Sequence, residues 1–206
     1  MITLDLRKQF KHLYQPSAKQ FSIVDVPQFN FLMIDGTGNP NTSQDYRDAL
    51  EALYGLSYTL KFGVKQGKYG KKKYDYPVMA LEGLWWMDDM REFSEARKDE
   101  WKWTMMIMQP DVITPDQVEL ARADLIKKKN LVSAAKIRFE TYHEGLSAQI
   151  MYFGPYADEG PTIQRLHDFI IESGHQLRGK HHEIYLGDPR RTAPEKLKTV
   201  IRQPMQ

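Results

Sequence analysis

The feature of this sequence that most constrains its fold is a succession of secondary-structure elements that occurs twice. Runs of Val, Ile, Phe and Met bounded by Gly and Pro predict strands, and apolar residues spaced three and four apart predict helices. Each half then has the order strand, strand, helix, strand, strand. The predicted strands are residues 21–25, 29–35, 78–87 and 101–109 in the first half, and residues 138–144, 147–153, 181–186 and 198–203 in the second.

Three helices are predicted from the signals at their ends. Ser43 occupies an N-cap position before the first helix, and Gly63 is expected to end that helix. The second helix lies between the two halves and begins at the capping box of residues 114–117, in which a Pro takes the first helical position. Pro161 begins the third helix, and Gly174 ends it.

The duplication predicts an α+β protein in which two similar modules pair edge to edge. They would form one antiparallel sheet of about eight strands, with the helices on one face and the other face free to form a cleft. We expect a single domain over residues 1–206, with a lead-in (1–20), a first half (21–110) and a second half (111–206). The basic segment after the first helix is expected to be a loop or hairpin tip, and residues 88–100 an acidic linker with a helical turn.

Composition excludes several classes of function. The 206 residues include no Cys, which excludes disulfide frameworks, thiolate zinc sites, iron–sulfur clusters and thiol nucleophiles. With 29 Lys and Arg against 27 Asp and Glu, the net charge of +2 argues against a nucleic-acid-binding protein. The first residues lack a signal-peptide core and no apolar run reaches membrane length, so we expect a cytoplasmic protein with no membrane segment.

Common cofactor and metal motifs are missing from the sequence. Residues 36–38 are Gly-Thr-Gly without the third glycine of a dinucleotide-binding loop. His181 and His182 are neighbours on a predicted strand, so their side chains point to opposite faces and cannot bind one metal together. The sequence therefore predicts neither a cofactor nor a metal. The lysines of residues 65–73 are better explained as a solvated loop than as a phosphate-binding surface.

All four tryptophans lie in one short part of the chain, at positions 85, 86, 101 and 103. On a strand, Trp101, Trp103 and Met105 share one face. Large aromatic surfaces around a few polar groups are typical of ligand pockets. The tryptophan cluster is therefore a candidate binding surface.

Two glutamates lie in strands that are otherwise apolar or aromatic. Glu82 shares a face with Trp86, and Glu183 shares one with Tyr185. We expect the two glutamates to occupy equivalent positions in the two halves. A carboxylate among aromatic rings suits a flat or cationic ligand. The alternative is that the aromatic residues fill the core and the glutamates are exposed at strand edges, and both interpretations remain open here.

At these residues the sequence resembles the stand-alone GyrI-like small-molecule-binding proteins, and the resemblance covers nearly the whole chain. It depends on five segments: residues 13–16 (LYQP), 31–40 (FLMIDGTGNP), 82–86 (EGLWW), 101–110 (WKWTMMIMQP) and 181–189 (HHEIYLGDP). Membership of this family implies two strand–helix–strand–strand modules related by a pseudo-twofold axis, with the ligand in the cleft between them.

The resemblance also implies partners and a ligand-contacting residue. In that family a glutamate on a late strand meets aromatic or cationic drug-like ligands, and Glu183 matches its position. Related domains are fused to helix-turn-helix segments in multidrug-sensing transcription activators. Only about twenty residues precede the first predicted strand, too few for such a segment, so we expect no direct DNA binding. The sequence leaves a homodimer open.

Some stand-alone members of the family hydrolyse cyclopropane-bearing, DNA-alkylating natural products, and this activity suits the residues present. Glu82 or Glu183 would orient and deprotonate a water, and a tyrosine hydroxyl would stabilise the developing phenolate. The alternative is a protein that binds or sequesters small molecules without chemistry, or that regulates gyrase by contact. The expected site comprises the catalytic residues Glu82, Glu183 and Tyr142 and the substrate-binding residues Trp86, Trp101, Trp103, Met105, Tyr152 and Tyr185.

Overall fold

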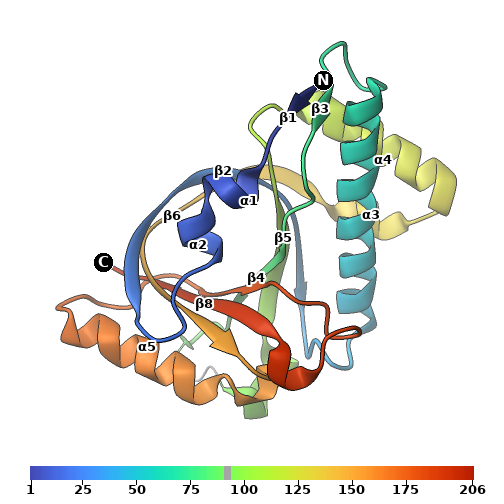
Figure 1. The fold of residues 1–206 in the computed structure, drawn as a ribbon. Helices are drawn as coiled ribbons and strands as arrows, with labels where there is room; N and C mark the ends of the chain where they lie inside the picture. The colour runs from blue at the N-terminus through green and yellow to red at the C-terminus, as the bar shows by residue number, and fades with distance from the viewer. Residues whose placement is uncertain (91–93) are drawn as a thin grey trace.

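The computed structural model describes residues 1–90 and 94–206 of the chain. Its main feature is a closed antiparallel barrel with the strand order β2-β5-β4-β7-β8-β6 (Figure 1). Its strands are β2 (Ser22–Thr37), β4 (Leu81–Trp86), β5 (Lys102–Gln109), β6 (Arg138–Phe153), β7 (His181–Tyr185) and β8 (Lys198–Pro204). A separate parallel pair consists of β1 (Ile2–Thr3) and β3 (Tyr74–Asp75).

The predicted duplication is confirmed by the order and pairing of the elements. The first half contains β2, α3 (Gln44–Gln66), β4 and β5, and the second contains β6, α5 (Gly160–Glu172), β7 and β8. Within the halves the strand neighbours are β2-β5-β4 and β6-β8-β7. The halves meet at two antiparallel seams, β4 with β7 and β2 with β6, which close the barrel. The two halves therefore share the same order of elements and the same order of strand neighbours.

The prediction of an eight-stranded sheet is wrong, because two pairs of predicted strands are single long strands. The segments on either side of Pro27 both belong to β2, whose register with β6 is the same before and after the proline. The segments on either side of the predicted turn at Gly145 both belong to β6. Gly145 has a φ of 71° and is accommodated within the strand without reversing it.

The long helices α3 and α5 lie on one face of the sheet, as predicted, whereas residues 13 and 14 of the lead-in line the cavity inside the barrel. Paired residues of antiparallel strands point to the same face, and the outward row includes Trp103, which packs against Tyr46 of α3. Ile201 of β8 lies on the same face of the sheet and belongs to one hydrophobic cluster with Leu166 of α5. The opposite face is the closed interior of the barrel. The expectation that this face forms the cleft is therefore wrong.

The helix ends follow the sequence signals with one exception. Ser43 caps α3, and the capping box of Thr114 and Gln117 begins α4 (Pro115–Lys129). Gly63 does not end α3, which continues to a left-handed cap at Gly67 with a φ of 79°. Gly63 makes room for a neighbouring ring instead, because a Cβ there would lie 1.9 Å from Cε2 of Tyr69.

Shorter helices complete the described chain. The lead-in forms α1 (Leu6–Gln9) and α2 (Lys11–Tyr14), which lie against the barrel (Figure 1). The predicted helical turn of the acidic linker is the 3-10 helix η2 (Glu95–Glu100), while residues 91–93 of that linker lie outside the described residues. The other 3-10 helices are η3 (Val132–Lys136), η4 (Tyr156–Asp158) and η5 (Pro194–Lys196). Among the described residues, no helix combines the length and apolar character needed to cross a bilayer.

The packing of Trp103 gives a testable consequence. Gly36 lies opposite Trp103 in the β2–β5 register, and a Cβ on Gly36 would lie 2.1 Å from the buried indole. We expect Gly36→Ala to lower the free energy of unfolding by about 2 kcal/mol, because an overpacked core must shift.

Urea unfolding measures this effect. Gly160→Ala is the matched control, since a Cβ on Gly160 in the first turn of α5 would meet no atom within 4 Å. Alanine in a helix is favoured over glycine by up to about 1 kcal/mol, so the control should retain or gain stability. Equal stability of the two variants would contradict the packing described for Trp103.

Candidate functional site

A long groove on the helix-bearing face of the sheet passes over the β4–β7 seam. Its volume is about 2060 Å³, and Glu183 of β7 lies in its wall. Around this carboxylate the groove is lined by aromatic side chains from separate parts of the chain. These are Tyr46 of α3, Trp85 of β4, Trp101, Tyr156 of η4 and Tyr185 of β7. The sequence predicts aromatic side chains around a carboxylate, and the groove contains such an arrangement. It lies on the helix-bearing face of the sheet, whereas the opposite face was expected.

The register of the seam decides which glutamate reaches the groove. Gly83 lies directly opposite Glu183, and Glu82 lies opposite Ile184. Because side chains alternate between the faces of a strand, Glu82 points into the barrel while Glu183 points into the groove. The expectation that Glu82 and Glu183 occupy equivalent positions is therefore wrong.

Both carboxylate oxygens of Glu183 are hydrogen-bonded. Oε1 lies 3.0 Å from Nε2 of His181, and Oε2 accepts a hydrogen bond of 2.7 Å from the hydroxyl of Tyr185. Burial raises the pKa of the Glu183 carboxyl, but the hydrogen bond and charge of His181 and the hydrogen bond from Tyr185 together bring this pKa below its usual value. Glu183 is therefore ionised at neutral pH.

The groove hydroxyls are protonated donors. Burial and the charge of Glu183 raise the pKa of Tyr46 and of Tyr185 well above the usual value. Burial, followed by the charges of Glu159 and Glu183, raises the pKa of Tyr156 to about 12. The rings of Trp85 and Trp101 pack edge to face, with their centroids 5.5 Å apart. Around Glu183 the walls are therefore aromatic and carry neutral hydroxyl groups, and Glu159 is a second carboxylate that acts on Tyr156.

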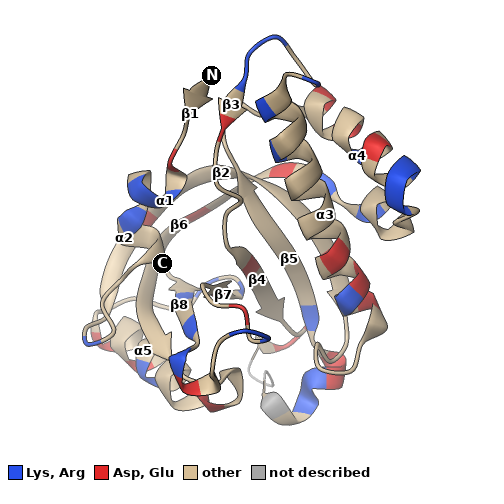
Figure 2. Cartoon of the chain, turned by 45° about the vertical axis from the view of Figure 1, so that its right-hand side comes forward, with Lys and Arg blue, Asp and Glu red and all other residues tan. Residues whose placement is uncertain are grey.

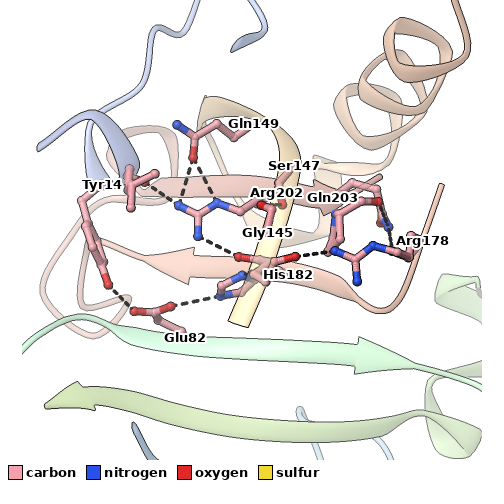
Figure 3. Close-up of polar contacts among 12 residues, drawn as sticks. Tyr14, Glu82, Gly145, Ser147, Gln149, Arg178, His182, Arg202 and Gln203 are labelled. Carbon is pink, nitrogen blue, oxygen red and sulfur yellow. Dashed lines mark hydrogen bonds and ion pairs between the residues drawn. The ribbon is translucent and has the colours of Figure 1, made fainter. Parts of the chain in front are cut away.

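Glu82 belongs to a second polar cluster, inside the barrel (Figure 3). Tyr14 of α2 donates a hydrogen bond of 2.6 Å to Glu82, whose other oxygen lies 3.1 Å from Nε2 of His182. Nδ1 of His182 lies 2.8 Å from Glu144, and Arg202 binds the same carboxylate at 3.0 Å. All five side chains are buried. The two carboxylates are thus balanced by one guanidinium and one imidazole ring.

This interior cluster surrounds a cavity of about 10 Å³, which has room for about one water molecule. Burial lowers the pKa of His182, but Glu144 and Glu82 outweigh this effect and raise it to about 9. Burial raises the pKa of Glu144, but His182 and Arg202 outweigh this effect and lower it to about 2. The interior cluster is therefore a charged network with no space for an organic ligand.

The predicted site residues are divided between several environments. Glu183, Trp101 and Tyr185 line the groove together. Glu82 and Tyr142 line the interior cavity instead.

The remaining predicted residues lie outside both spaces. Trp103 and Met105 are fully buried in the core. Trp86 lies on the interior-facing side of β4, where Nζ of Lys180 is 3.3 Å from its ring centroid. Tyr152 donates its hydroxyl to the carbonyl of Pro155.

The sequence analysis missed Trp85, Tyr46 and Tyr156 as groove residues and His181 as a partner of Glu183. For Trp85 and His181 the signal was present, because alternation along β4 and β7 places them on the same face as Glu183 once the register is known. Tyr46 and Tyr156 belong to other elements and reach the groove only through the tertiary fold.

Charged residues of both signs are spread over the surface (Figure 2). Basic residues gather in the loop after α3 and in the last turn of α4, where Lys127, Lys128 and Lys129 complement the helix dipole. In the loop region Lys68 and Lys65 are paired with Asp124 and Asp75. Within residues 1–90 and 94–206, no three acidic or histidine side chains converge as a metal site.

Comparison with known proteins identifies the fold family. The model of the GyrI-like small molecule binding domain matches residues 19–206. The chain belongs to this family. The groove of this GyrI-like chain therefore lies in a domain of a small-molecule-binding family. None of the curated proteins matches the chain.

Solved structures similar to this GyrI-like protein include two from Listeria innocua. An uncharacterized conserved protein is 35% identical with a TM-score of 0.89, and the match covers 98% of this chain and 100% of that one. A protein described as a hydrolase is 34% identical with a TM-score of 0.85 over the same shares of the two chains. The C-terminal domain of EcmrR is 11% identical with a TM-score of 0.56, over 91% of this chain and 97% of that one, and shows the fold alone.

The interior cluster of this GyrI-like protein predicts a pH dependence of stability. The pKa of His182 is raised from 6.5 to about 9, so the folded state holds a proton that the unfolded chain releases as the pH rises above neutrality. The stabilisation is complete below about pH 6.5 and is lost as the pH rises through about 9, and it amounts to about 3 kcal/mol.

Urea unfolding between these pH values measures the loss. His182→Gln should start less stable and show little further loss over the same range, because the group that exchanges the proton has been removed. Equal slopes in the parent protein and in the variant would mean that His182 does not carry the proton.

Proposed function

We propose that the groove binds flat, hydrophobic, drug-like molecules, including cationic ones, with Glu183 as the contact for their polar or charged part. The observation that carries this proposal is the ionised carboxylate of Glu183 among aromatic rings in a large open groove. Aromatic faces stack on flat ligands and attract cations, and a carboxylate adds charge recognition. The family to which the chain belongs supports the same conclusion.

We further propose that the protein hydrolyses cyclopropane-containing alkylating compounds by adding water. In a cyclopropane conjugated to a dienone, the water oxygen bonds to a ring carbon while the carbon–carbon bond to that atom breaks. The electron pair moves to the dienone oxygen, which becomes a phenolate, and the proton released by the water finally neutralises it. No leaving group, oxidant or reductant is needed. The 34% identical protein described as a hydrolase supports a hydrolytic activity.

Glu183 is the residue suited to hold the water. Its carboxylate is ionised at neutral pH and accepts a hydrogen bond from a water that points at the ligand, then takes its proton as the new bond forms. Glu82 is unsuited to this role because it lines the interior cavity of about 10 Å³, which has no space for an organic ligand, whereas Glu183 lines the groove.

The developing phenolate needs a donor, and the groove offers two protonated hydroxyls near Glu183. Tyr46 belongs to α3 and Tyr156 to η4, and the raised pKa of each keeps it in the donor form. Donors held in place before charge develops are the main source of such stabilisation. Tyr142 and Tyr152 are unsuited, because they lie outside the groove.

The proposal predicts the effect of Glu183→Gln. Incubated with a spirocyclopropyl cyclohexadienone, the parent protein should give a product heavier by one water, detected by mass spectrometry. The variant should add water at least about a hundredfold more slowly, because an amide cannot accept the proton. Its thermal melt should stay near that of the parent protein, because an amide retains one hydrogen-bonded oxygen.

Glu172→Gln is the matched control, since Glu172 is exposed at the end of α5 and should leave the rate unchanged. Water addition at the parent rate in Glu183→Gln would contradict the role of Glu183. Tight binding of the compound by the parent protein with no product would favour a protein that binds or sequesters without chemistry.

A further inference from the structure

The hydroxyl of Tyr185 is held from two sides. Nε1 of Trp85 donates a hydrogen bond of 2.9 Å to the Tyr185 oxygen, and the Tyr185 hydroxyl donates one of 2.7 Å to Glu183. A phenol has a single hydrogen. Because the indole N–H occupies an acceptor position on the oxygen, the hydrogen of Tyr185 is directed toward Glu183. The three groups thus form a chain of hydrogen bonds with one direction, from Trp85 to Tyr185 to Glu183.

Gly83 leaves the space that the indole of Trp85 needs in order to donate its hydrogen bond to Tyr185. It lies opposite Glu183 at the seam, two residues before Trp85 on the same face of β4. A Cβ on Gly83 would lie 2.7 Å from Nε1 of Trp85, the same atom that donates to Tyr185. Any side chain at position 83 therefore displaces the indole from its position beside Tyr185.

We propose that Trp85 and Gly83 are positioning residues that act through Tyr185 to fix the orientation and charge of the Glu183 carboxylate. This inference rests on the proposed function, because it concerns the same groove. Trp85 has two separable roles in it: the ring forms part of the aromatic wall, and the N–H directs the Tyr185 hydroxyl. Gly83 supplies the space in which the indole takes that position.

Several other groups also act on Glu183. On β7, His181 lies 3.0 Å from its other oxygen, and His182 acts from the interior face through its charge. Tyr46 of α3 and Tyr156 of η4 interact with its charge, and the buried carboxylate of Glu159 acts on Tyr156 and Tyr185. Trp85 is itself a neighbour of two of these groups, since it pairs with His181 across the seam and its ring lies 6.0 Å from that of Tyr46, so the comparison is repeated without the Tyr185 hydroxyl. The contribution of the Trp85–Tyr185 chain can therefore be measured separately.

Loss of the directed hydrogen bond should make Glu183 easier to protonate. A hydrogen bond to the charged form of a carboxylate favours that form, and a hydroxyl that rotates freely donates it for only part of the time. A cationic ligand that depends on ionised Glu183 should then be released at a higher pH. A neutral ligand of the same shape should lose only the affinity that is lost when a phenyl ring replaces the larger indole ring in the wall of the groove.

The test compares Trp85→Phe with the parent protein, using N-methylacridinium titrated from neutral into acid pH as a permanent cation, and acridine at mildly alkaline pH as its neutral counterpart. The pH midpoint of N-methylacridinium binding, followed by fluorescence, should rise by about half a pH unit or more. Water addition to the spirocyclopropyl dienone should slow severalfold through kcat, with KM little changed. The affinity for acridine should change by less than about threefold.

Two comparisons separate positioning from a general structural effect. Trp86→Phe removes an indole N–H from the adjacent residue, outside the groove, and should leave the pH midpoint unchanged. In a Tyr185→Phe background, Trp85→Phe should add no further shift, because the chain is already broken.

The outcomes are distinguishable. If Glu183→Gln weakens N-methylacridinium binding but Trp85→Phe leaves the midpoint in place, the inference is wrong and the proposed function stands. A shift that is the same with and without the Tyr185 hydroxyl also overturns it. If the parent protein binds neither dye, the proposed function fails and the inference with it. Should Trp85→Phe fail to fold, Gly83→Ala gives the same test, because it displaces the indole and leaves the ring present.

Discussion

The antiparallel pairing of β4 with β7 is the contact on which both polar clusters depend. This seam closes the barrel between the two halves, and its register places Gly83 opposite Glu183. Alternation along β7 then sends His181 and Glu183 to the groove face and His182 to the interior. One residue of slippage would exchange the two faces, burying Glu183 in the barrel and exposing His182. The groove and the interior network are therefore consequences of the same strand register.

The interior network explains how charged residues are tolerated in the closed barrel. Removing one member of a buried charged network leaves its partner unpaired, which costs several kcal/mol. Here Glu82 and Glu144 are each shared by two donors, and His182 bridges them. The lead-in completes the arrangement, since Tyr14 supplies a donor to Glu82. Tyr14 precedes the region that matches the family model, so the lead-in adds to the barrel a polar contact from outside that region.

Much of the fold could be predicted from sequence because its signals are local. Helix ends at Ser43, Thr114 and Pro161 follow from capping chemistry, and the repeated order of elements follows from apolar periodicity. The number of strands could not be predicted from the sequence. Pro27 and Gly145 look like strand ends, but pairing with distant segments holds each of them within a long strand. Glu183 and Tyr185 were found because they share a face of one strand. The pairing of Glu82 with Glu183 failed because it required the register between strands, which local sequence does not contain.

The central claim is that a flat ligand lies against Glu183 in the groove, on the aromatic surface to which Trp85 and Tyr46 contribute neighbouring rings. A crystal structure of the protein soaked with N-methylacridinium tests this most directly. The account predicts the ring system stacked on an aromatic side chain of the groove, with its charged nitrogen directed toward the Glu183 carboxylate. A dye bound elsewhere on the surface, with the groove at Glu183 left empty, would contradict it.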